Sequence, residues 1–66
     1  MADTELQIAK QQSSKLRHLI LTQSAVVLSL KREGGERLQQ ATQLLESMRD
    51  ELQVLEKRVD GLMAAS

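Results

Sequence analysis

The chain lacks cysteine, proline, phenylalanine, tyrosine and tryptophan, and it contains one histidine and three glycines among 66 residues. Without cysteine, neither a disulfide nor a thiolate metal site can stabilise the fold. Without aromatic rings, a compact globular core lacks its usual large side chains, whereas helices pack well on Leu, Ile, Val and Met. The composition therefore predicts an all-α protein that gains stability by associating with other helices, because a domain this small buries little surface alone.

Long hydrophobic runs are also missing. The most apolar segment, residues 19–30, contains several polar residues and covers about twelve positions, against roughly twenty needed to cross a bilayer. Near the N-terminus, Asp3 and Glu5 occupy positions where a signal peptide carries positive charge. We therefore expect no transmembrane helix, no signal peptide and a cytoplasmic location.

Neither sign of charge is in excess, since nine Lys and Arg residues balance nine Asp and Glu residues. Nucleic acids and anionic membranes are usually bound by a concentrated basic face. Lys10, Lys15 and Arg17 form a small basic cluster, but there is no aromatic ring to stack on a base. Nucleic-acid binding is therefore not expected, and an RNA-binding dimer of helical hairpins is kept as the alternative function.

What the chain does contain is an unbroken heptad pattern in its second half. Apolar residues follow one another at alternating steps of three and four: Leu38, Ala41, Leu45, Met48, Leu52, Leu55, Val59 and Leu62. This spacing gives a helix a narrow apolar stripe that another helix covers well. The pattern predicts a helix-binding surface of the coiled-coil type.

Glycine occurs as a pair only at Gly34-Gly35, which is typical of a left-handed helix end. Thr4 and Gln7 have the spacing of a capping box. We therefore predict a helix over 4–33, a turn at 34–35 and a second helix over 36–64, forming an antiparallel hairpin within a single domain. One continuous helix is the competing layout, and its two interior glycines would cost about 2 kcal/mol.

The first helix is predicted to be apolar on two faces. Its main stripe comprises Ile8, Ala9, Gln12, Leu16, Leu19, Ile20, Gln23, Val26, Val27 and Leu30, while residues 10–14 are polar and weakly patterned. A second stripe, formed by Leu21, Ala25 and Leu28, lies on nearly the opposite side. The main stripe can cover the second helix, so the second stripe predicts contact with something outside the hairpin.

Two glutamines interrupt the main stripe of the first helix. Gln12 and Gln23 could fix the register by hydrogen bonding across the helix pair. Alternatively, a slight rotation of the helix could leave both side chains at the edge of the stripe. The sequence favours neither interpretation.

No combination of residues indicates catalysis or ligand binding. His18 has no cysteine or second histidine with which to bind a metal. The serines have no base and orienting carboxylate at the spacing of a known nucleophile motif. We therefore expect a protein that is not an enzyme and that has no metal site and no cofactor.

The positions beside the second helix's stripe bear on its partners. A parallel homodimer would set Glu51 against Glu56 of the other chain, which disfavours that arrangement. Leu44 and Met63 widen the stripe, as in a bundle of three or four helices. The expected function is a non-enzymatic interaction module, such as a small subunit, an adaptor or a chaperone-like partner. The sequence leaves open whether it binds itself or another helical protein.

Overall fold

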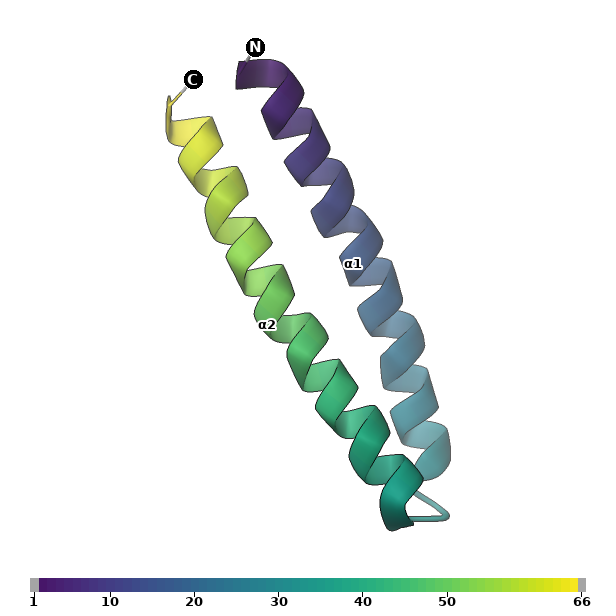
Figure 1. Cartoon of the computed structure of the whole chain (residues 1–66). Helices are drawn as coiled ribbons and strands as arrows, with labels where there is room; N and C mark the ends of the chain where they lie inside the picture. Colours follow the sequence, from purple (N-terminus) through teal and green to yellow (C-terminus); the bar gives the residue numbers. More distant parts are fainter. Residues whose placement is uncertain (1, 66) are drawn as a thin grey trace.

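The computed structural model describes the backbone of residues 2–65 and the side chains of residues 4–65. Two helices, α1 (Ala2–Leu30) and α2 (Gly35–Ala65), lie side by side and antiparallel, with both chain ends at the same end of the molecule (Figure 1). The molecule measures 48 × 14 × 12 Å. The structure confirms an all-α helical hairpin, and the single continuous helix is wrong.

The turn follows the geometry of a left-handed helix end. The Gly34 N–H donates to the Leu30 carbonyl at 2.9 Å, and Gly34 has a φ of +68°. The Glu33 N–H also donates to the Leu30 carbonyl, at 3.0 Å. These two bonds close residues 31–33 into a turn, so α1 ends three residues before the predicted end.

The helix starts also differ from the prediction. α1 begins at Ala2, so Thr4 lies inside the first turn and does not cap the helix. α2 begins at Gly35, whose φ of +83° lets the chain reverse directly into the helix. Glu36 then places an acidic group in the first turn, next to the positive end of the helix dipole.

An apolar seam runs between the two helices. Ala41 and Leu45 are buried and the other heptad residues of α2 are half-buried. From α1 the seam receives residues at the same alternating steps of three and four: Leu6, Ala9, Ser13, Leu16, Ile20, Gln23, Val27 and Leu30. Val27, Ala41 and Leu45 form the buried cluster, and Ile20, Leu30 and Leu38 pack against it. This cluster lies in the half of the seam nearest the turn, and Ala9, Ser13 and Leu16 are buried in the other half.

The face of α1 that meets α2 differs from the predicted main stripe. Leu6 and Ser13 belong to the seam, whereas Ile8, Leu19 and Val26 are exposed beside it. A strict heptad step keeps residues on one line along the helix, and these three exposed residues fall off that line. Within residues 2–65, neither helix has a stretch long and apolar enough to span a membrane.

Alanine substitutions at two of the glycines should change the stability of the protein in opposite directions. A methyl group added at Gly34 or Gly61 would have no atom within 4 Å, so only backbone conformation decides the effect. Gly34→Ala forces a left-handed alanine and should destabilise the protein by about 1–2 kcal/mol. Gly61→Ala, inside α2, should stabilise it by about 0.5–1 kcal/mol. Urea unfolding at one chain concentration measures both changes. A gain of stability in Gly34→Ala would contradict the assigned turn, and a loss in Gly61→Ala would contradict the prediction for α2.

Candidate helix-binding surfaces

The side of the seam on which each residue lies follows from one ion pair. With Leu6 and Leu38 as heptad positions a, Arg17 and Glu56 both occupy position e. Arg17 Nη2 donates to Glu56 Oε1 at 3.2 Å, with the two side chains 61% and 45% exposed. A pair this exposed contributes at most about 1 kcal/mol. Its contact shows that the e positions of both helices lie on one side of the seam, so the g positions lie on the other.

Gln23 forms a hydrogen bond across the helix pair. Its Nε2 donates to the Ala41 carbonyl oxygen at 3.0 Å. That oxygen belongs to a helical peptide group, whose second lone pair is available to the amide. Gln12, by contrast, is exposed at the edge of the seam. Of the two interpretations of the glutamines, the register-fixing bond therefore holds for Gln23 and the edge position for Gln12.

Small residues occupy several seam positions. Ala9, Ser13 and Ala41 are all buried. The Ser13 hydroxyl donates to the Lys10 carbonyl at 3.0 Å, so its burial leaves no unmet donor. A buried Ser13 was not expected from the polar segment 10–14. The sequence could have indicated this burial through the heptad spacing of Ser13 between Ala9 and Leu16, provided that a serine is counted as a possible seam residue.

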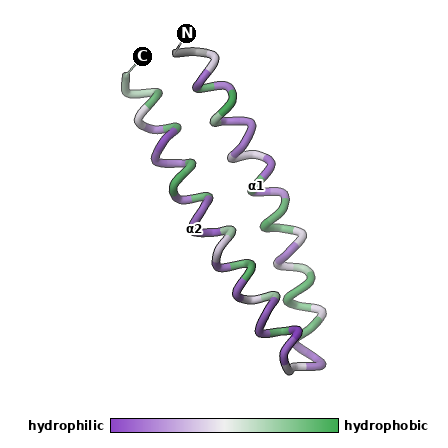
Figure 2. The backbone as a smooth tube through the Cα atoms, in the orientation of Figure 1, coloured by the Kyte–Doolittle hydropathy of each residue, from purple (hydrophilic) through white to green (hydrophobic). Residues whose placement is uncertain are grey.

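The second stripe of α1 lies on the molecular surface. Leu21 and Leu28 are 68% and 64% exposed, and Ala25 between them is also exposed. Figure 2 shows the hydrophobic colouring extending through the part of α1 near the turn. The stripe occupies heptad positions b and f, away from the seam, so α2 does not cover it.

A second exposed apolar surface was not predicted, and it spans both helices. It consists of large apolar side chains at heptad positions c and g, which are 40–68% exposed: Ile8, Leu19, Val26, Leu44 and Val54. Because all of them lie on the side of the seam opposite the Arg17–Glu56 pair, we name this surface the g-side face. Finding it required the relative placement of the two helices, which neither helical pattern specifies alone.

A polar cleft lies at the e side of the seam. This shallow cleft of about 240 Å³ is lined by Ser13, Arg17, Glu56, Val59 and Asp60. Its guanidinium and its hydroxyl already hydrogen bond within the protein. This volume is below the roughly 300–1,000 Å³ typical of ligand pockets. Among the described residues, no three His, Asp or Glu side chains come together as metal ligands.

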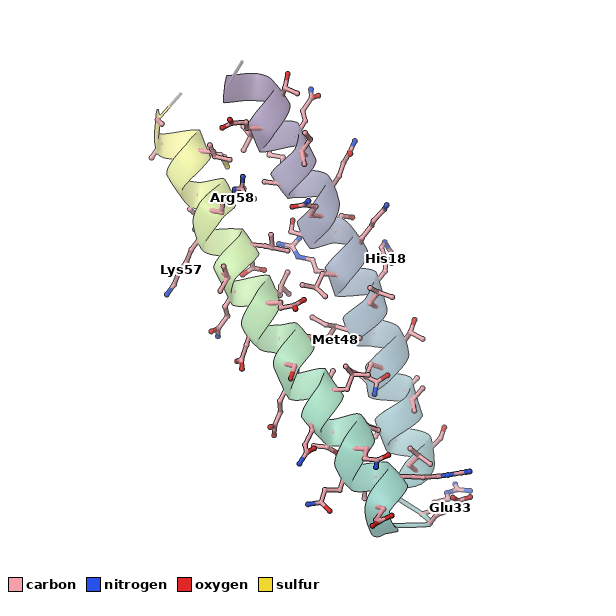
Figure 3. The ribbon with its side chains drawn as sticks, in the orientation of Figure 1. His18, Glu33, Met48, Lys57 and Arg58 are labelled. Carbon is pink, nitrogen blue, oxygen red and sulfur yellow. The ribbon has the colours of Figure 1, made fainter. Side chains whose placement is uncertain are left out.

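Histidine and the basic cluster occupy separate surfaces. His18 projects from the outer side of α1, while Met48 of the seam lies between the helices (Figure 3). Lys10 and Arg17 occupy e positions, and Arg17 is paired with Glu56. Lys15 is at position c, on the other side of the seam. The three basic residues therefore do not share one face of the hairpin.

No family model, curated protein or solved structure matches this chain. The two exposed apolar surfaces are the features of the molecule that bear on its function. Every predicted interface residue has a defined place. Those of α2 line the seam, with Leu16, Ile20, Val27 and Leu30 opposite them, whereas the second stripe and Leu19 are exposed.

Proposed function

We propose that this protein is a non-enzymatic, cytoplasmic protein–protein interaction module that acts as a small subunit, adaptor or chaperone-like partner in a complex of helices. The observation that supports this function most directly is the exposure of Leu21 and Leu28 on the second stripe. Two leucines and an alanine at i, i+4 and i+7 present one line of apolar atoms. A partner helix that carries its own apolar stripe fits such a line.

The second stripe can supply part of the free energy of binding. Full burial of a leucine side chain contributes about 1.5–3 kcal/mol, so Leu21 and Leu28 together offer about 3–6 kcal/mol before the cost of association. Thr22, Ser24 and Ser29 around the second stripe are neutral, and the charge beside it is Arg32, which lines the same surface hollow as Leu28 and Ser29 at the turn end. The balanced charge of the chain and the separated basic residues give RNA a much weaker attachment.

Replacing the two leucines tests this function. We expect Leu21→Glu with Leu28→Glu to lose the helical partner that wild-type protein retains when tagged and purified from native lysate. Each carboxylate would be buried unpaired beneath the partner, which is costly. The hairpin itself should persist in circular dichroism, because both positions are exposed.

A matched control uses the same row of the same helix. Gln7 and Ser14 are exposed and occupy heptad position b, as Leu21 and Leu28 do. Gln7→Glu with Ser14→Glu adds the same two charges without removing apolar surface, so it should retain the partner. If the leucine double variant keeps the wild-type partners, or if wild-type protein binds RNA with a steep salt dependence, the proposed function is wrong.

A further inference from the structure

We propose that the g-side face binds a second copy of this chain, forming a four-helix bundle of two hairpins whose turns lie at the same end. The proposal rests on the proposed function, since it treats the chain as an interaction module, and it identifies one partner. It concerns a surface on the opposite side of the seam from Leu21 and Leu28. The second stripe would therefore remain available on a dimer.

The hairpin exposes more area than a compact monomer of its mass is expected to expose. A compact protein of this size, 7.4 kDa, is expected to expose about 4,200 Å². The hairpin exposes 5275 Å². The excess, about 1,000 Å², exceeds the roughly 800 Å² that each partner buries in a standard stable interface. Two packed helices cannot enclose a core, and a second pair provides the missing layer.

The g-side face complements itself because its apolar residues lie at matching heights. Val27 packs with Ala41 and Leu45, so the neighbouring Val26 lies level with Leu44. Leu19 lies one heptad farther from the turn than Val26. Measured along the helix axis, Leu19 is within about 4.5 Å of the height of Val54. A two-fold axis parallel to the helices places α1 of one copy against α2 of the other at equal heights. Val26 then meets Leu44, and Leu19 meets Val54.

The charges on this face count against the alternative arrangement. With both turns at one end, Lys15 lies between the levels of Glu51 and Arg58 of the other copy, about 6 Å and about 4.5 Å away along the axis, so it meets one charge of each sign. With the turns at opposite ends, α2 would face α2, and Glu51 would lie near the Glu51 of the second copy. Leu44 would then lie near a charged Arg58. The arrangement with both turns at one end pairs the apolar residues with one another and avoids both of these contacts.

Sedimentation equilibrium of the whole chain tests the dimer. We expect wild-type protein to have twice the mass of a 7.4 kDa chain at micromolar concentration. Val26→Glu with Leu44→Glu should raise the dimer dissociation constant at least about 100-fold, because four carboxylates meet at one height. Leu21→Glu with Leu28→Glu, which adds equal charge elsewhere on the surface, should remain dimeric.

Crosslinking tests the orientation without altering the charge, and it serves even if the glutamate variant folds poorly. Because the chain has no cysteine, single cysteines can be placed by Val26→Cys in one sample and Leu44→Cys in another. Mixing the two samples with a short bismaleimide should give a crosslinked heterodimer. Leu28→Cys mixed with Leu44→Cys, in which one cysteine lies on the opposite side of α1, should not.

The outcomes separate this proposal from the proposed function. Three results would each show that the g-side face does not bind a second copy. They are a folded wild-type monomer, a Val26→Glu with Leu44→Glu variant that remains dimeric, and the absence of the heterodimer crosslink. Loss of the dimer in the Leu21 and Leu28 variant would also overturn the proposal, because the wrong face would be involved. None of these results concerns the partner retained from lysate, whose loss or retention tests the second stripe alone.

Discussion

Leu45→Ala should lower the free energy of unfolding by about 2–4 kcal/mol, because Leu45 is 7% exposed and belongs to the buried cluster with Val27 and Ala41. Truncation removes apolar contacts on both helices and leaves a space beside Ala41 that has no larger side chain to fill it. For so small a protein, this is a substantial part of the total stability. Urea unfolding followed by circular dichroism, at one chain concentration, measures the loss.

The neighbouring position provides the control. Glu46 is exposed, so Glu46→Ala should change the stability by less than about 0.5 kcal/mol. Similar losses in the two variants would mean that the seam runs along another line of α2. A large loss at Leu45 with little effect at Glu46 would support the register that places Ala41 and Leu45 opposite Val27.

The α2 side of the seam could be predicted from the sequence because its heptad positions are all apolar. The α1 side could not, because two of its seam positions are polar. Ser13 tolerates burial by bonding to the Lys10 carbonyl, and Gln23 by bonding to the Ala41 carbonyl. A pattern based on hydrophobicity rejects such residues, since it does not register that their polar atoms have partners. Leu19 and Val26 were therefore placed in the seam instead of beside it.

The two candidate surfaces differ in how much of each could be predicted from the sequence alone. The second stripe lies on a single helix, so the spacing of Leu21, Ala25 and Leu28 was enough to predict it. The g-side face combines residues of both helices that are far apart in the chain, such as Val26 and Leu44. Its existence depends on which flanks of the helices share a side and on which residues share a height. The turn and the contacts between the helices determine which flanks share a side and which residues share a height. A pattern within one helix carries no information on either.

Diluting the protein should cause the largest change of all, the loss of most of its helix. A hairpin covers only one side of each helix, so most of the remaining stability has to come from association. If two copies fold as one unit, each tenfold increase in chain concentration favours the folded dimer by about 1.4 kcal/mol. The helical signal at 222 nm should therefore fall on dilution, and the thermal midpoint should rise with concentration.

The Val26→Glu with Leu44→Glu variant makes this dilution experiment decisive. Both residues are exposed in the hairpin, so their replacement removes little from the seam between α1 and α2. If association through the g-side face stabilises the helices, the variant should show a low helical signal that does not change with concentration. If the hairpin were stable alone, the variant would stay strongly helical as a proven monomer at every concentration, and the wild type would stay strongly helical on dilution. That result would make the seam of Val27, Ala41 and Leu45 sufficient for folding, and association would have no part in it.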